Sequence, residues 1–307
     1  MIKKQKSFAS FLAAIFLSLS GEVFSSSPSI LVENEAVEFS KEQNKQPSPL
    51  EKPSLVNESN DQPLTAENIM ELVDQRYDGD TKKQYGRLTL IDKRKNKRVR
   101  NIFQLSKIYG EDKRVITQVL SPSEVSGTTI LAYEWDEVKR EDETWLYLPQ
   151  LRKVKRLATT DKSSYFLGSD FTYSDLSGLE VEDFSYEFIN NESTNEQWVL
   201  FAKPKKDIGS IVIDKTGYIK IKYWIDKEKM MIVKAKYWLK DGSKVKYYNV
   251  SGFDKIDDIW IFRRAQMVLS QGKKMLHASI FEIDTVEYNH KVKDEMFTTY
   301  AMERKIE

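Results

Sequence analysis

Two aspartates in the middle of the chain come closest, by type and spacing, to a catalytic or metal-binding site. Asp170 and Asp175 lie in the stretch FLGSDFTYSDL, which begins at Phe166. Paired carboxylates can divide acid and base roles in catalysis or bind a metal ion. No histidine or third ligand lies nearby in the sequence, so capping and bonding to the neighbouring basic strand is the favoured interpretation. Gly168 allows a turn, and Ser169 and Asp170 are expected to cap a short helix or hold a loop.

The rest of the chain offers little material for covalent chemistry. It has no cysteine, which excludes disulfides, thiolate metal sites and a cysteine nucleophile. Its only two histidines, His277 and His290, leave little material for a histidine-rich metal site. We therefore predict no catalytic residue, metal or cofactor, and no enzyme. The 307 residues carry 48 Lys plus Arg against 47 Asp plus Glu, so the chain has no general electrostatic attraction to nucleic acid.

A basic stretch precedes these aspartates. From Trp145 the chain reads WLYLPQLRKVKRL, in which Trp145 and Tyr147 alternate with leucines. The pattern predicts a hairpin that turns at Pro149-Gln150 and has a cationic outer face, formed by Arg152, Lys153, Lys155 and Arg156. This face is either a docking site for an anionic headgroup or acidic partner, or a strand edge that its charges protect from aggregation.

These motifs are positioned by a chain whose periodicity is mostly two. One helix is predicted, from Ala66 to Gln75, with Thr65 as its cap and Asn68 at the third helical position. Strands are predicted at 86–92, 99–109, 114–120, 128–133, 143–148, 152–157, 182–189, 197–202, 218–225, 231–239, 244–250, 260–270 and 275–287. Consecutive strands with short polar connections predict an antiparallel meander, and hence a mainly β fold.

The connection from Lys240 to Ser243 is the clearest hairpin signal. Its Asp241-Gly242 pair is typical of a type I′ turn. In the strand before it, apolar and lysine side chains alternate, so one face of the sheet is predicted to be apolar and the other exposed to solvent. With so few helices to cover the apolar face, the sheet either curls into a barrel or sandwich, or leaves a hydrophobic concavity under a small lid.

The N-terminal part has a different composition. Three lysines precede the apolar run 8–19, which is too short to span a bilayer and typical of a signal peptide; we assign residues 1–25 to it. Residues 26–64 hold five prolines and seven acids against three lysines, which predicts a disordered linker. The folded domain is predicted at 65–307, and the mature protein outside the cytoplasmic membrane.

The paired motifs WLYLP..RKVKR and GSDF.Y.DL resemble the signature of the outer-membrane lipoprotein-sorting proteins, the LolA/LolB-like superfamily, in its branch of large periplasmic members. The residues that carry this resemblance are Trp145, Tyr147, Pro149, Arg152, Lys153, Arg156, Gly168, Ser169, Asp170, Phe171, Tyr173 and Asp175. The resemblance implies a strongly curved antiparallel sheet, an unclosed (half) β-barrel with a few helices as its lid.

The implied function is non-catalytic: a periplasmic carrier that binds acyl chains of a lipoprotein or lipid and transfers them toward the outer membrane, with transient membrane contact. An alternative is an accessory subunit of an RND-type inner-membrane exporter without lipid cargo of its own. The alternation of the strands nominates groove residues without showing which face is concave: Leu88, Leu90, Phe103, Leu105, Val233, Ala235, Tyr237 and Leu239.

Overall fold

The computed structural model describes residues 64–137 and 140–306, so the predicted signal peptide and nearly all of the predicted linker lie outside it. The described chain forms one antiparallel sheet of 13 strands in the order β6-β5-β4-β3-β2-β1-β13-β12-β11-β10-β9-β8-β7. The strands are β1 (Thr81–Asp92), β2 (Lys97–Tyr109), β3 (Asp112–Ser121), β4 (Thr129–Glu134), β5 (Glu143–Leu148), β6 (Lys153–Arg156), β7 (Phe184–Phe188), β8 (Gln197–Pro204), β9 (Tyr218–Asp226), β10 (Met231–Leu239), β11 (Lys244–Ile256), β12 (Ile259–Gln271) and β13 (Lys274–Tyr288).

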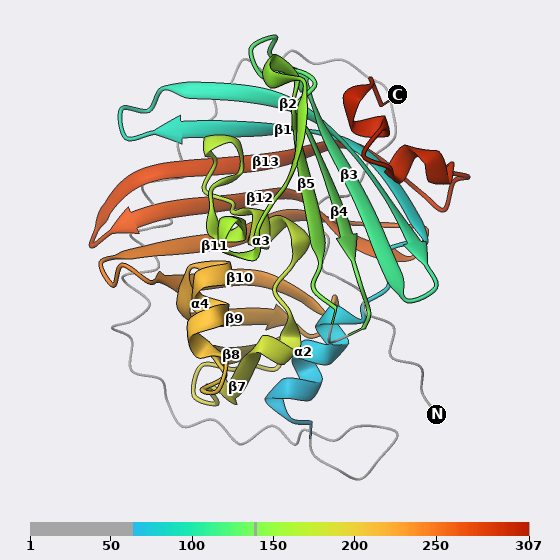
Figure 1. Ribbon diagram of the computed structural model, residues 1–307. Helices are drawn as coiled ribbons and strands as arrows, with labels where there is room; N and C mark the ends of the chain where they lie inside the picture. The colour runs from blue at the N-terminus through green and yellow to red at the C-terminus, as the bar shows by residue number, and fades with distance from the viewer. Residues whose placement is uncertain (1–63, 138–139, 307) are drawn as a thin grey trace, which may run out of the picture.

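The sheet is curved and open. Figure 1 shows β1 to β5 turning away from the direction of β7 to β13, so that the sheet wraps around the three helices. Strands β6 and β7 are its two edges and do not pair with each other. The predicted mainly β fold, an unclosed barrel with few helices, is therefore confirmed.

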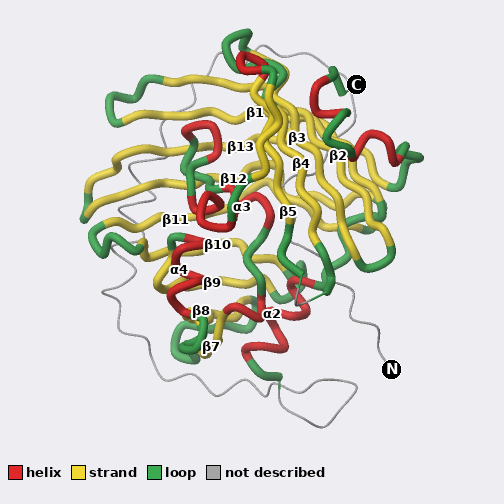
Figure 2. Tube along the Cα trace, in the orientation of Figure 1, coloured by secondary structure: helices red, strands yellow, loops and turns green. Residues whose placement is uncertain are grey.

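Three short helices cover the concave face, as Figure 2 shows. They are α2 (Ala66–Asp74), α3 (Tyr173–Ser177) and α4 (Gly209–Thr216). The predicted cap of α2 is confirmed: Asn68 N–H donates to the Thr65 hydroxyl, and Thr65 N–H donates to the Asn68 side chain. The sequence allowed a short helix or a loop after Gly168 but did not place α3, which is only five residues long and is capped by Thr172. It missed α4, whose β-branched residues also suit a strand.

Each face of the sheet has its own core because neighbouring residues of a strand point to opposite faces. Ile130 and Leu131 in β4 illustrate the division. Ile130 belongs to the main cluster beneath the helices, whereas Leu131 packs in a second cluster. The second cluster is covered by two C-terminal turns, η5 (Asp294–Phe297) and η6 (Ala301–Glu303), which lie beside β3 and β4 in Figure 1.

Two local features depend on glycine. At the bulge between Tyr85 and Gly86, a Cβ on Gly86 would lie 2.5 Å from the Glu282 carbonyl oxygen, so only glycine fits. In the β10–β11 hairpin, Gly242 has a φ of 70°, but Asp241 is not in the left-handed region. The predicted hairpin is present, but the predicted type I′ turn is wrong, since that turn needs positive φ at both residues. Instead, Asp241 accepts hydrogen bonds from the N–H groups of Ser243 and Lys244.

Candidate functional site

An apolar cavity of about 100 Å³ lies between α2 and the concave face of the sheet. Met70 and Val73 of α2 form one wall. The opposite wall consists of strand side chains, and the segment between α3 and β7 closes one side. These other apolar lining residues are Phe171, Leu179, Val181, Tyr186, Tyr223, Met231, Ile232, Tyr237, Tyr248, Phe262 and Met267. The cavity is therefore a mainly apolar space under a helix rather than a long open groove.

A second, smaller cavity of about 30 Å³ lies farther along the same face. Leu88, Ile102, Phe166, Leu176 and Phe281 line it, together with the polar Gln104 and Thr117. Phe171 lines both cavities. The Phe171 side chain is therefore part of the wall of both cavities.

The groove candidates named from strand alternation fall on both faces of the sheet. Tyr237 lines the larger cavity and Leu88 the smaller one. Leu90, Val233 and Ala235 are buried in the same main cluster, and Leu239 is partly buried at the end of β10. Phe103 and Leu105, in contrast, belong to the second cluster, under the C-terminal turns. In that part of β2, Ile102 faces the concave side. The prediction failed there because alternation along β2 does not show which of its two faces is concave.

The GSDF motif is fixed to β13. Asp170 is 2% exposed, and its carboxylate lies 2.7 Å from both His277 Nδ1 and the Ser279 hydroxyl. Asp170 N–H in turn donates to the Ser279 hydroxyl. The prediction that Asp170 bonds to the basic strand is therefore wrong. Its partner His277 is 107 residues away in sequence and reaches Asp170 only through the fold, so the local sequence could not indicate it. The expected loop contact is made by Ser169, whose hydroxyl accepts from Phe171 N–H.

Asp175 links α3 to the sheet. It is the third helical residue of a capping box with Thr172, so the expected capping role is confirmed for Asp175, with Thr172 as the cap. Its carboxylate also accepts from the Tyr218 hydroxyl at 2.7 Å and lies 3.4 Å from the Lys246 ammonium. Lys246 is 1% exposed, and burial lowers the pKa of its ammonium although Asp175 opposes that shift. Burial, together with the Asp175 charge, raises the pKa of Tyr218 well above its usual value.

The residues of the WLYLP motif serve the other face and the edge. Trp145 and Tyr147 pack in the second cluster, and the predicted turn is a 3-10 turn, η1 (Pro149–Leu151). The basic residues follow on the edge strand β6, where Arg156 lies 2.6 Å from Glu143 and Lys155 lies 3.1 Å from Asp161. Arg152 adopts left-handed φ at 47° just before that strand, and Lys153 is exposed. Charged side chains on an edge strand prevent it from pairing with another chain, so the position of β6 at the sheet edge accounts for these charges without a binding partner for the protein.

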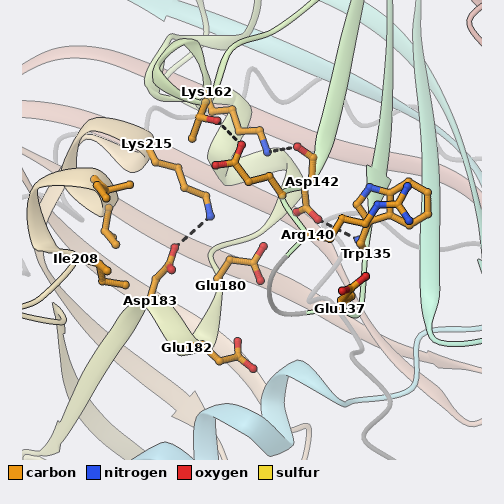
Figure 3. A pocket seen from close by; sticks show the side chains of 14 residues that line it. Trp135, Glu137, Arg140, Asp142, Lys162, Glu180, Glu182, Asp183, Ile208 and Lys215 are labelled. Atoms are coloured by element: carbon orange, nitrogen blue, oxygen red, sulfur yellow. Dashed lines mark hydrogen bonds and ion pairs between the residues drawn. The ribbon is translucent and has the colours of Figure 1, made fainter.

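A polar pocket of about 210 Å³, shown in Figure 3, lies between α4 and the β4–β5 connection. Lys215 lies 3.1 Å from Asp183, and Lys162 donates to the Asp142 carbonyl. Burial by itself would lower the pKa of Lys215, but the carboxylates of Glu180 and Asp183 outweigh it and raise that pKa. The side chains that line this pocket include neither histidine nor serine. Within it the Thr159 hydroxyl donates to the Glu141 carboxylate at 2.9 Å.

The sequence prediction missed a second buried charge cluster, on the connection from α2 to β1. Asp78 lies 2.7 Å from the Lys82 ammonium and 3.5 Å from that of Lys113, and all three side chains are buried. Burial would raise the pKa of Asp78, but the two lysines lower it to about 2. Asp78 thus offsets part of the positive charge of the two buried lysines, which fits a structural role. Across residues 64–137 and 140–306, no cluster of three or more His, Cys, Asp or Glu side chains is arranged to hold a metal ion.

Solved structures with the same architecture provide the comparison. A domain of the outer membrane lipoprotein-sorting type from Vibrio parahaemolyticus is 22% identical, with a TM-score of 0.68 over 78% of this chain and 98% of that one. A DUF1329 family protein from Desulfovibrio piger is 21% identical, with a TM-score of 0.67 over 77% of this chain and 97% of that one. A LolA superfamily protein from Nitrosomonas europaea is 18% identical, with a TM-score of 0.58 over 78% of this chain and 99% of that one.

A family model described as “-like: Uncharacterized protein” matches residues 111–304, more than half of the chain. The chain belongs to this family, and its fold is LolA-like. The fold that the paired motifs implied is thereby confirmed. No curated protein matches the sequence. In the part of the chain that the structure describes, no helix is long and apolar enough to cross a membrane.

Proposed function

We propose that this LolA-like protein is a carrier that holds acyl chains of a lipid or lipoprotein against the concave face of its sheet. The observation that carries the proposal is the apolar cavity between α2 and strands β9 to β12. Acyl chains gain free energy by leaving water for such a surface. The LolA-like fold of the solved relatives supports the same function.

The lid of this carrier is α2 together with residues 171–181. The cavity of about 100 Å³ is smaller than the roughly 300–1,000 Å³ of typical ligand sites, so cargo enters only when the lid moves. Helix α2 lies on the sheet through apolar side chains, of which Ile69, Met70 and Val73 are buried. Because α2 is held mainly by apolar packing, this part of the lid can exchange its contacts for contacts with an acyl chain at little net cost.

The proposed carrier works outside the cytoplasmic membrane, because the N-terminal sequence has the pattern of a signal peptide. Its proposed function involves no catalytic step. Delivery toward the outer membrane is part of the proposal. Native mass spectrometry of gently purified protein should then reveal a stoichiometric acylated species. Repeated recovery of protein without any such species would contradict the proposal.

A cavity-filling variant tests the site itself. Val73→Phe adds volume inside the cavity, whereas Leu72→Phe changes the neighbouring residue, which is 41% exposed. We expect Val73→Phe to weaken binding of a fluorescent fatty acid about tenfold, which corresponds to ~1.4 kcal/mol. Leu72→Phe should bind as the parent protein does. Equal binding by both variants, with matching melting curves, would place the acyl chain elsewhere.

A further inference from the structure

Three hairpins end next to one another along one rim of the sheet. They join β1 to β2, β12 to β13 and β10 to β11, and Figure 1 shows their tips together at the left. The register fixes this arrangement, since Asp92 pairs with His277 across β1 and β13, and Gln271 pairs with Lys244 across β12 and β11. The tips therefore form a continuous row.

This row is strongly cationic. The β1–β2 tip and the start of β2 carry five cations, the β12–β13 tip carries two, and the β10–β11 tip carries two. We call these nine residues the basic rim: Lys93, Arg94, Lys95, Lys97, Arg98, Lys240, Lys244, Lys273 and Lys274. All of them except Lys244 are exposed.

Acidic residues do not neutralise the basic rim. Asp92 accepts from the N–H groups of Arg94 and Asn96 within its own turn, and Asp241 lies 2.6 Å from the Lys244 ammonium. Lys240 lies 3.6 Å from Asp214. For the six rim residues Lys93, Arg94, Lys97, Arg98, Lys273 and Lys274, no ion pair is found with any described residue. Among the residues that the structure describes, at least six of the nine rim cations therefore have no acidic partner.

The side chains of the rim favour a lipid surface over a protein partner. Stable protein interfaces are anchored by large apolar or aromatic side chains in fitted pockets. No exposed large hydrophobic side chain lies in the three tips as described, since the nearest in sequence, Val99, follows the β1–β2 tip within β2. Long cationic side chains in a row suit many mobile anionic headgroups, each cation adding about 1 kcal/mol near an anionic membrane.

We propose that the basic rim docks this protein on membranes that contain anionic lipids. Docking in this orientation brings the hairpin ends of the sheet, rather than its α2 lid, against the bilayer. The contact is electrostatic, so it weakens as salt shortens the range of the interaction. It does not depend on the proposed acyl carrier function, and its test is separate from the fatty-acid titration.

Vesicle flotation with the full-length protein tests the docking. The probes are vesicles of phosphatidylcholine alone and vesicles with about one third phosphatidylglycerol, at low salt and at about 0.5 M salt. We expect binding only to the anionic vesicles and only at low salt. K273E/K274E and K93E/R94E should each lower that binding about 30-fold or more, the equivalent of two lost cation contacts.

The matched control is K205E/K206E, which reverses two exposed lysines between β8 and α4. This variant should bind anionic vesicles as the parent protein does. Three outcomes would overturn the proposal: equal binding to neutral vesicles, equal losses in the control and the rim variants, or binding of polyglutamate without binding of vesicles. The last outcome would assign the rim to an acidic protein. All three variants lie on the surface, and circular dichroism melts verify their fold.

Discussion

At the residue scale, the buried pair of Asp175 and Lys246 explains how α3 is held over an apolar sheet. Taking both charges out of water is costly, and their attraction offsets that cost only while both remain. Tyr218 adds a hydrogen bond to each partner, at 2.7 Å to Asp175 and 2.9 Å to Lys246. The motif aspartate is thus a positioning residue for a segment that lines both apolar cavities.

Asp175→Asn tests this role with little change in shape. Asparagine still serves the capping box, as Asn68 does in the same position of α2. The variant leaves the Lys246 ammonium buried without its counterion, so we expect a loss of about 3–5 kcal/mol in the free energy of unfolding, measured with urea. Asp175→Asn combined with Lys246→Met should recover most of the loss. A double variant no more stable than Asp175→Asn would show that the pair is not the cause.

The contacts of Asp170 mark where residue-level prediction from the sequence stops. Its position in a loop and the contact made by Ser169 could be inferred from local spacing. Its partners His277 and Ser279 could not, because they lie more than 100 residues away and meet it through the sheet register. The basic rim was readable only in part, since five cations lie between residues 93 and 98, but its three hairpins are neighbours only in the fold.

At the element scale, the hydrophobic periodicity of the sequence was sufficient to locate the strands and helix α2. All 13 predicted strands correspond to strands of the structure, including β4, which has no exposed residue, and β6, which has no buried one. The pattern could not show which of the two alternating sets of side chains faces the concave side. Phe103 and Leu105 of β2 lie on the convex face, opposite Ile102. Short elements such as α3 were missed since five residues contain too little periodicity.

Helix α2 gives a prediction about the lid as an element. Thr65→Ala removes the capping hydroxyl, which should destabilise the helix by about 1 kcal/mol. Amide hydrogen exchange within α2 should then become about fivefold faster, while exchange in β12 and β13 stays unchanged. Binding of a fluorescent fatty acid should begin faster if opening of α2 admits the cargo. Faster exchange across the whole sheet would mean that α2 is not an independent lid.

At the scale of the whole molecule, the two faces of one sheet carry separate apolar clusters. The concave core contains the apolar cavities, and the convex core is closed by the C-terminal turns, where Phe297 and Met302 are fully buried. Tyr133 secures these turns by donating its hydroxyl to the Phe297 carbonyl at 2.6 Å. Neither apolar cavity is lined by a buried member of the convex cluster. This fits a division of labour in which one face is packed for stability and the other is left able to open.

Phe297→Ala tests this division. Truncation of a fully buried phenylalanine should cost about 3–5 kcal/mol of unfolding free energy. Affinity for a fluorescent fatty acid should change less than about twofold under conditions where the variant is folded, because Phe297 lines neither apolar cavity. Tyr300→Ala, at a residue 63% exposed in the same segment, should change stability by less than about 0.5 kcal/mol. A large loss of affinity in Phe297→Ala would instead show that the two faces of the sheet are coupled, with the C-terminal turns controlling the concave side.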